Sequence, residues 1–230
     1  MKTLMMFSIS VCAWAQSGIE QPTLGKILDR NGAVRTVYGI AASVTLGDSE
    51  LTGVLSSACS KVLCLAKTET SIASPSGSVA APSGRALFAF DGDAAFVWFA
   101  ESRQLARWQN DELRLIDSII DGDVLSMRAT EGSVEFAVRR SSGVWIVTLD
   151  GGVVDSVPRS TGPVMLIPGG VVYATHDEIV IRDIRIPLGH VRGFSSMAPG
   201  YLQVRAEGVD YALRVEKGRE TLFQLPGVEQ

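Results

Sequence analysis

Four short apolar runs separated by polar turns make up residues 191–225, VRGFSSMAPGYLQVRAEGVDYALRVEKGRETLFQL. In the third run, Tyr211, Leu213 and Val215 alternate with Ala212 and Arg214, which is the period-two pattern of a half-buried β-strand. In the second run, Leu202 and Val204 alternate with polar residues in the same way. The stretch therefore predicts a unit of four short strands.

The same pattern recurs toward the N-terminus. Turn sequences follow one another at steps of about 32 to 45 residues, a spacing typical of solenoids and propellers. They are Asn31-Gly32, Pro75-Ser76-Gly77, Asn110-Asp111, Asp150-Gly151-Gly152, Arg182-Asp183 and Lys217-Gly218. Further four-strand patterns occupy residues 53–81, 86–116, 123–157 and 163–188, and a three-strand pattern occupies residues 26–46. No window of helical length has an uninterrupted apolar stripe, so the domain is predicted to be all-β.

Repeated four-strand units predict a β-propeller, because a blade cannot cover both of its apolar faces alone and packs radially against its neighbours. Six blades are expected, with five blades and an N-terminal hairpin as the alternative. A two-sheet sandwich of this length has too few strands to match the pattern. An open ring leaves unpaired strand edges. We therefore expect residues 26–46 to close the ring beside residues 191–225.

The segment Val209-Asp210-Tyr211-Ala212-Leu213, followed by the Lys217-Gly218 turn and an apolar strand, resembles the degenerate blade repeats of quinoprotein-like propellers. The resemblance covers the strand-turn-strand core of each unit and implies the propeller fold. The Trp and Ala-x-Asp-Gly positions diagnostic of that family are absent, so the resemblance implies no quinone, and no other cofactor is expected.

The first fifteen residues have the pattern of a signal peptide. Lys2 provides the positive charge, residues 4–11 the apolar stretch, and Ala13-Trp14-Ala15 a small-x-small cleavage site before Gln16. The expected organisation is a signal peptide at 1–15 and one propeller domain at 16–230, secreted or periplasmic in a bacterium. A lipoprotein anchored through Cys12 is the alternative, disfavoured because Val11 stands where processing requires a small residue.

The composition limits the classes of partner that the chain is expected to bind. The chain has 46% hydrophobic and 20% charged residues, which excludes disorder, and its formal net charge of −4 argues against nucleic acid or anionic membrane. After the leader no segment is long and apolar enough to cross a bilayer, and a monomer is expected. Cys59 and Cys64 flank a turn, so an exported protein is expected to join them in a disulfide, with two buried thiols as the alternative.

Catalytic and metal-binding motifs are sparse. His176 and His190 are the two histidines of the chain, and His176 lies in a polar turn that we interpret as solvated rather than metal-binding. Asp91-Gly92-Asp93 and Asp121-Gly122-Asp123 lack the later oxygen ligands of a calcium loop. No nucleophile elbow, phosphate loop or dinucleotide fingerprint is present, so we predict no catalytic and no metal-ligating residue.

Propeller topology indicates where a ligand would bind. The connections that enter the inner strands gather at one mouth of the axis, beside the loops between second and third strands. The predicted ligand-binding residues on these connections are Arg85, Asp121, Asp123, His190 and Arg192; Glu50 also falls there. The expected function is an exported, non-enzymatic binding module for a protein or small polar ligand. The alternative is a hydrolase or lyase acting on a carbohydrate or small molecule at the same mouth.

Overall fold

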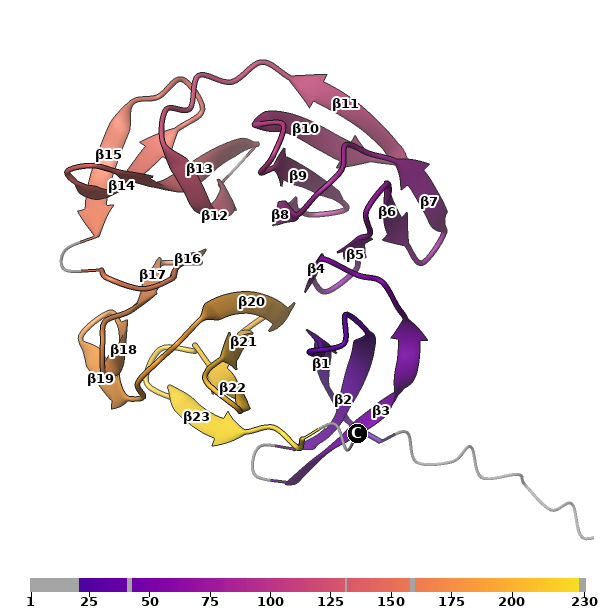
Figure 1. The fold of residues 1–230 in the computed structure, drawn as a ribbon, viewed down its shortest axis with the longest axis vertical. Helices are drawn as coiled ribbons and strands as arrows, with labels where there is room; N and C mark the ends of the chain where they lie inside the picture. Colours follow the sequence, from indigo (N-terminus) through magenta and orange to yellow (C-terminus); the bar gives the residue numbers. More distant parts are fainter. Residues whose placement is uncertain (1–20, 41–42, 131, 158–159, 228–230) are drawn as a thin grey trace, which may run out of the picture.

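Six antiparallel sheets form a ring around a central axis (Figure 1). The structure is a computed structural model that describes residues 21–40, 43–130, 132–157 and 160–227. The predicted signal peptide and Cys12 lie outside these residues. Blade 1 has three strands and blades 2 to 6 have four each, so the six-bladed prediction is confirmed.

The strands of each blade follow one another in the chain and pair with their neighbours. Blade 1 contains β1 (Thr23–Leu28), β2 (Val34–Ile40) and β3 (Ser43–Leu51). Blades 2 and 3 contain β4 (Ser56–Cys59), β5 (Cys64–Lys67), β6 (Ser71–Ser74), β7 (Gly77–Ala80), β8 (Ala86–Asp91), β9 (Ala94–Phe99), β10 (Gln104–Gln109) and β11 (Glu112–Ile116). Blades 4 to 6 contain β12 (Asp123–Thr130), β13 (Ser133–Arg140), β14 (Gly143–Thr148), β15 (Val153–Val157), β16 (Val164–Ile167), β17 (Gly170–Ala174), β18 (Glu178–Ile181), β19 (Ile184–Pro187), β20 (Gly193–Ala198), β21 (Tyr201–Arg205), β22 (Asp210–Arg214) and β23 (Thr221–Gln224).

The predicted strands agree with these to within a few residues. The largest difference is at the end of blade 1, where the expected pattern stops at residue 46 and β3 continues to Leu51. A further difference is at the start of blade 2, where a strand was expected from residue 53 and β4 begins at Ser56. The intervening residues form the connection from blade 1: the Val54 N–H donates to the Gly32 carbonyl at 2.9 Å, and the Leu55 N–H donates to that of Lys67 at 2.7 Å. These hydrogen bonds to two different blades explain why an apolar stretch is not a strand.

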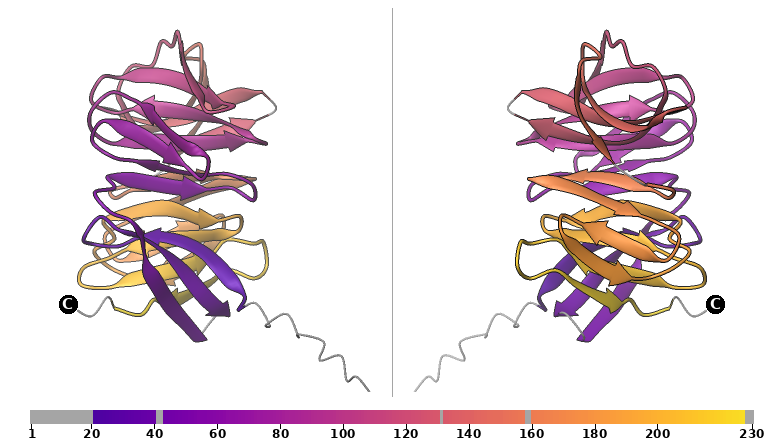
Figure 2. Two further views of the ribbon diagram at one scale, coloured as in Figure 1. Left: turned by 90° about the vertical axis from the view of Figure 1, so that its right-hand side faces the viewer. Right: turned by 90° about the vertical axis from the view of Figure 1, so that its left-hand side faces the viewer.

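Each interface between neighbouring blades has its own apolar cluster. Between blades 3 and 4, for example, Trp98 packs edge-on against Phe136, with ring centroids 6.0 Å apart. Between blades 6 and 1, Met197 and Leu225 pack against Ile27 and Val37. The blade 1–blade 2 cluster is small, with Leu28, Val34, Val54 and Ala66 as its buried members. The core is therefore a ring of clusters, and the edge-on views show blade 1 beside blade 6 (Figure 2).

Blade 1 lacks the innermost strand of a complete blade. Gly25, near the start of β1, lies against the Met197 carbonyl near the end of β20; a Cβ there would be 2.4 Å from that oxygen. Leu28, at the end of β1, bonds Arg205, which is paired with Gly193 at the start of β20. β1 consequently runs antiparallel to β20 and matches the second strand of the other blades. The first strands β4, β8, β12, β16 and β20 surround the axis, with β1 beside β20 and β4.

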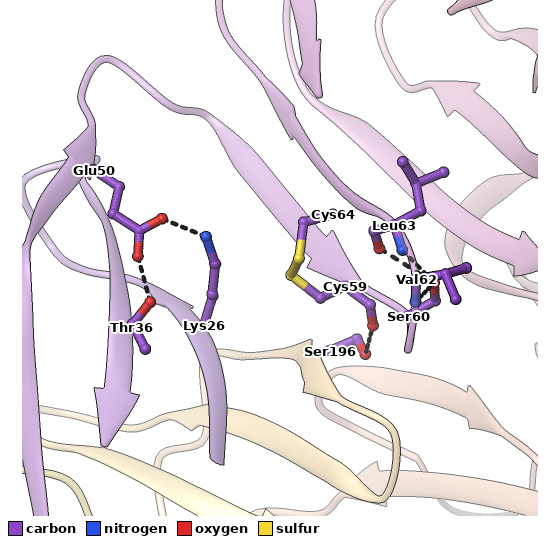
Figure 3. The surroundings of a disulfide bond; sticks show 9 residues. All are labelled: Lys26, Thr36, Glu50, Cys59, Ser60, Val62, Leu63, Cys64 and Ser196. Atoms are coloured by element: carbon purple, nitrogen blue, oxygen red, sulfur yellow. Dashed lines mark hydrogen bonds and ion pairs between the residues drawn. A yellow bond between two sulfur atoms is a disulfide. The ribbon is translucent and has the colours of Figure 1, made fainter. Parts of the chain in front are cut away.

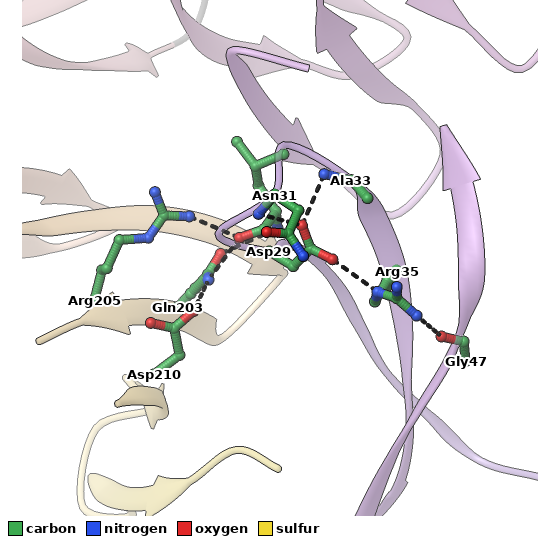
Figure 4. Close-up of polar contacts among 9 residues, drawn as sticks. Asp29, Asn31, Ala33, Arg35, Gly47, Gln203, Arg205 and Asp210 are labelled. Atoms are coloured by element: carbon green, nitrogen blue, oxygen red, sulfur yellow. Dashed lines mark hydrogen bonds and ion pairs between the residues drawn. The ribbon is translucent and has the colours of Figure 1, made fainter. Parts of the chain in front are cut away.

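A side chain takes the place of that missing strand at the end of β1. The buried Gln203 amide accepts a hydrogen bond from the Leu28 N–H at 3.2 Å and donates to the Leu28 carbonyl at 2.9 Å (Figure 4). It also donates to Asp210 and accepts from the Ser195 hydroxyl. The amide thus pairs with both main-chain groups of Leu28, as a neighbouring strand would. The prediction that the N-terminal and C-terminal segments close the ring is confirmed.

The Cys59–Cys64 disulfide links directly opposed residues of β4 and β5 (Figure 3). Ser60 caps the turn between them: its N–H donates to the Leu63 carbonyl, and its hydroxyl accepts from the Leu63 N–H. Cys59 also accepts a hydrogen bond through its carbonyl from the Ser196 hydroxyl of β20 at 3.3 Å. The predicted disulfide is therefore confirmed, and it lies where blade 2 meets blade 6.

Reducing this disulfide is expected to lower the free energy of unfolding by about 2 kcal/mol, because the closed loop is short and the entropic benefit grows with loop length. Urea unfolding with and without reductant measures the change. Intact mass after alkylation provides the control, since native protein should take up no alkyl group at Cys59 and Cys64 before reduction. Alkylation of both in native, non-reduced protein contradicts the bridge.

Candidate functional site

A cavity of about 220 Å³ lies on the axis, bounded by the first strands of blades 2 to 6. The side chains at its wall are mainly apolar and come from four of these strands: Phe88, Leu125, Met127, Met165 and Phe194. Where the first strand of blade 1 is missing, the lining extends to Leu28 and Arg205. We call this space the axial cavity. Its volume is below the roughly 300–1,000 Å³ of most small-molecule sites, so it suits a small ligand.

Three serine hydroxyls in the lining are engaged in bonds between blades. The Ser56 hydroxyl donates to the Ala86 carbonyl at 2.7 Å, linking blades 2 and 3. The Ser126 hydroxyl accepts from the Leu166 N–H at 3.0 Å, linking blades 4 and 5. The Ser196 hydroxyl links blade 6 to blade 2 through Cys59. These bonds hold the first strands of different blades together, so the three hydroxyls have a structural role in the ring.

Three arginines lie at one end of the axial cavity, and we call this end the arginine mouth. Arg85 immediately precedes β8 and Arg192 immediately precedes β20, so both lie at the face where the chain enters the first strands. Arg205 ends β21 opposite Gly193, the first residue of β20, which places it at the same face. None of the described residues that line the cavity carries a carboxylate. The lining therefore presents positive charge.

Most other arginines near the blade interfaces hold main-chain carbonyls of the next blade or connection. Arg103 donates to the Ile120 and Gly122 carbonyls, Arg139 to that of Gly162 and Arg182 to that of Val215. Arg205 donates to the Leu28 carbonyl at 2.7 Å, so it has a structural role besides lining the cavity. These guanidinium groups replace missing backbone pairing between blades.

Arg85 and Arg192 do not follow that pattern. Within the described part of the chain the Arg85 guanidinium has no hydrogen-bond or ion-pair partner, and its residue is exposed. Arg192 pairs with Glu207 at 3.3 Å, and the two side chains are 66% and 63% exposed. An ion pair this exposed contributes little stability and is easily exchanged for another anion. Both guanidinium groups can therefore bind a ligand without breaking a buried interaction.

The other three predicted binding residues lie outside the cavity lining: Asp121 and His190 are on connections between blades, and Asp123 is the first residue of β12. The main-chain carbonyl of Asp121 accepts from Arg140 at 3.0 Å, and Asp123 pairs across β12 and β13 with Arg139. His190 packs edge-on against His176, with ring centroids 5.7 Å apart. The structure thus brings Arg85 and Arg192 to one cavity and leaves Asp121, Asp123 and His190 outside it.

Glu50 is also engaged elsewhere. Its carboxylate accepts hydrogen bonds from Lys26 and Thr36 inside blade 1 (Figure 3). Burial by itself raises the pKa of this carboxyl, but the bonds from Lys26 and Thr36 and the Lys26 charge lower it overall. Glu50 therefore belongs to the packing of blade 1.

Sequence reasoning missed Arg205 and the apolar cavity wall. The alternation of Leu202 and Val204 with Gln203 and Arg205 predicts that the two polar residues face solvent, and Gln203 is instead 1% exposed. The apolar wall residues lie on predicted strands, but only closure of the ring shows which of them reach the axis. One feature of the sequence could have indicated Arg205 as a cavity residue: it directly follows the apolar run that ends in Val204, at the loop end of the predicted strand.

No family model matches the chain, and no curated protein sequence matches it. Solved structures with a similar fold include apo AztD from Citrobacter koseri, with 10% identity, a TM-score of 0.44, and coverage of 88% of this chain and 69% of that one. The computationally designed Ika8 protein has 13% identity, a TM-score of 0.45 and coverage of 89% and 74%. The extracellular domain of BT4673 from B. thetaiotaomicron has 11% identity, a TM-score of 0.46 and coverage of 90% and 34%. Likenesses at this level carry no argument about function.

Two further features concern the described residues alone. No helix among them is long and apolar enough to cross a membrane. No group of three or more His, Cys, Asp or Glu side chains among them is placed to hold a metal ion.

Proposed function

We propose that this protein is an exported, non-enzymatic binding module that holds a negatively charged ligand at the arginine mouth. The observation that carries the proposal is the pair Arg85 and Arg192, which lie at one end of the axial cavity with donors open to solvent. A guanidinium group binds carboxylate or phosphate through paired, charge-assisted hydrogen bonds. Binding through loops at the end of a rigid ring also keeps the ligand groups in fixed positions.

Export is part of the same proposal. The Cys59–Cys64 disulfide supports it, because structural disulfides persist in oxidising compartments such as the periplasm and the cell exterior. The leader pattern at residues 1–15 supports it independently. We propose the bacterial cell envelope or exterior as the location, with cleavage before Gln16.

The alternative, a hydrolase or lyase, requires converging carboxylates or a metal at the mouth. Asp121 and Asp123 lie outside the cavity lining, and the described lining residues include no carboxylate. Because a specific feature favours anion binding and none favours catalysis, binding is the function we propose.

Benzoate and its neutral isostere benzamide test the charge of the ligand. Wild-type protein is expected to bind benzoate at least about tenfold more tightly than benzamide, because a hydrogen bond to a charged group contributes about 1.5–3 kcal/mol. Arg85→Ala combined with Arg192→Ala should remove this preference. Isothermal titration calorimetry measures both affinities.

Arg114→Ala is the matched control, since Arg114 is 80% exposed on the outer strand β11 and pairs with Glu112. It removes one positive charge without touching the cavity and should keep the full preference for benzoate. Equal affinities of wild-type protein for benzoate and benzamide, or an undiminished preference in the double variant, would contradict the proposal.

A further inference from the structure

We infer that the ligand of the arginine mouth is amphipathic: a small monocarboxylate whose apolar body enters the axial cavity. This inference rests on the proposed function and adds the chemical class of the ligand. The carboxylate is placed by the guanidinium groups of Arg85 and Arg192, which lie at one end of the cavity. The apolar body, or tail, of the ligand is placed by the cavity wall behind these guanidinium groups.

The wall is apolar on several sides. Phe88, Leu125, Met165 and Phe194 are half-buried: each packs against an inter-blade cluster and also contributes to the cavity lining. Methionine and aromatic side chains adapt to irregular apolar ligands, and their burial by a ligand releases water from apolar surface. A tail of a few carbon atoms lies against them on more than one side.

Most serine hydroxyls of the wall already bond the protein. Five serines line the cavity: the hydroxyls of Ser56, Ser126, Ser195 and Ser196 each bond a group of the protein itself, whereas that of Ser57 has no such bond within the described part of the chain. A polyhydroxylated ligand such as a sugar would need several free side-chain partners in this wall. The combination of a charged mouth, hydroxyls that are mostly engaged by the protein and an apolar wall therefore matches an amphipathic anion better than a fully polar one.

The missing strand of blade 1 contributes to the shape of the site. β20 and β4 are joined by the Ser196–Cys59 hydrogen bond toward their ends, whereas near their starts the cavity lining reaches Leu28 and Arg205 of the closure between blades 1 and 6. An innermost strand in blade 1 would occupy this position beside β1. The incomplete blade thus lets Leu28 and Arg205 contribute to the cavity lining on the side of the arginine mouth.

A chain-length series tests the apolar part. Each methylene buried in an apolar site strengthens binding about fourfold, so Kd should fall about 15-fold from butanoate to hexanoate. Calorimetric titration of wild-type protein with butanoate, pentanoate and hexanoate measures this slope. A Kd that stays constant along the series would overturn the inference, because it would mean that the apolar tail stays outside the cavity.

Met165→Gln keeps the length of the wall side chain and makes it polar, so the gain per methylene should fall below about twofold. Leu115→Gln, at a 64% exposed position on β11, is the matched control and should leave the gain unchanged. If Met165→Gln does not fold, Phe194→Leu replaces it and should also flatten the series by removing part of the wall. An unchanged slope in the folded wall variant would contradict the placement of the tail.

Failure of this inference is distinguishable from failure of the proposed function. If the chain-length series is flat while the benzoate preference depends on Arg85 and Arg192, the anion site stands and the placement of the apolar tail is wrong. If the series stays steep in the Arg85→Ala, Arg192→Ala double variant and the neutral hexanamide binds equally well, the two arginines do not bind the carboxylate, which contradicts both proposals.

Discussion

Gln203→Leu is expected to lower the free energy of unfolding by about 3–5 kcal/mol, because it leaves the buried Leu28 N–H without its partner and removes the bonds to the Ser195 hydroxyl and to Asp210. Leucine has a similar size but cannot bond the Leu28 N–H, and it removes one donor to Asp210, which keeps its ion pair with Arg30. The Leu28 carbonyl keeps its bond from Arg205, so the expected loss of stability comes from the other groups. Blade 1 would lose the Gln203 bonds to β21 in the middle of the closure and keep the Arg205 bond.

Urea unfolding measured by circular dichroism tests this expectation, with the midpoint and slope compared between variants. Gln104→Leu is the matched control, because Gln104 is exposed at the start of β10, and the same substitution there should change stability by less than about 0.5 kcal/mol. A Gln203→Leu protein as stable as the control would show that ring closure does not depend on this amide. Amide hydrogen exchange should also accelerate in β1 relative to the strands of blade 4.

Asp29→Asn is expected to lower the free energy of unfolding by about 2–3 kcal/mol at neutral pH, because it leaves the partly buried charge of Arg35 without its carboxylate partner. Asp29 is 3% exposed and accepts hydrogen bonds from the Asn31 and Ala33 N–H groups and from Arg35 (Figure 4). Arg35 in turn donates to the Gly47 carbonyl of β3. An asparagine can accept some of these bonds but does not neutralise the Arg35 charge. The β1–β2 turn would then lose its link to β3.

The effect of Asp29→Asn should shrink in acid. Burial alone raises the pKa of Asp29, but the hydrogen bond from Arg35, those from Ala33 and Asn31, and the Arg35 charge lower it overall. A carboxyl with a lowered folded-state pKa contributes its full stability above about pH 4 and loses it as the pH falls through the lowered value. Wild-type protein therefore loses this contribution in acid, whereas the Asp29→Asn variant has no such contribution to lose.

Urea unfolding at a series of pH values from 7 to 3 measures the difference between the two proteins. Asp93→Asn, in the exposed turn between β8 and β9, is the control and should have little effect at any pH. A difference between wild type and Asp29→Asn that stays constant down to pH 3 contradicts the role given to the ionised carboxylate.

Strand number and fold class could be read from the sequence because both depend on local patterns. Alternation in stretches such as residues 133–139, and turn residues such as Asn31-Gly32, act within a few residues of themselves. The disulfide was also predictable, because Cys59 and Cys64 flank a short turn and face each other in its hairpin. Repetition of the unit then left a closed ring as the arrangement that covers every blade.

The candidate site depends on contacts that close over long sequence separations. Arg85 and Arg192 immediately precede β8 and β20, and they line one cavity because the ring brings those strands to one axis. Asp121 and His190 lie on equivalent connections and Asp123 begins β12, yet all three lie outside the cavity lining. Topology places a connection at a face, and packing determines which side chains reach the axis.

The sequence by itself determined where the strands and turns fall, because backbone preference and apolar alternation are properties of a few neighbouring residues. Only the tertiary structure decided that β1 runs antiparallel to β20, that blade 1 lacks its innermost strand and that Gln203 closes the gap. The reason is that both faces of a propeller blade are covered. A polar residue in an alternating strand reads as exposed, and whether it is buried depends on the neighbouring blade, which for Gln203 lies 175 residues away in the chain.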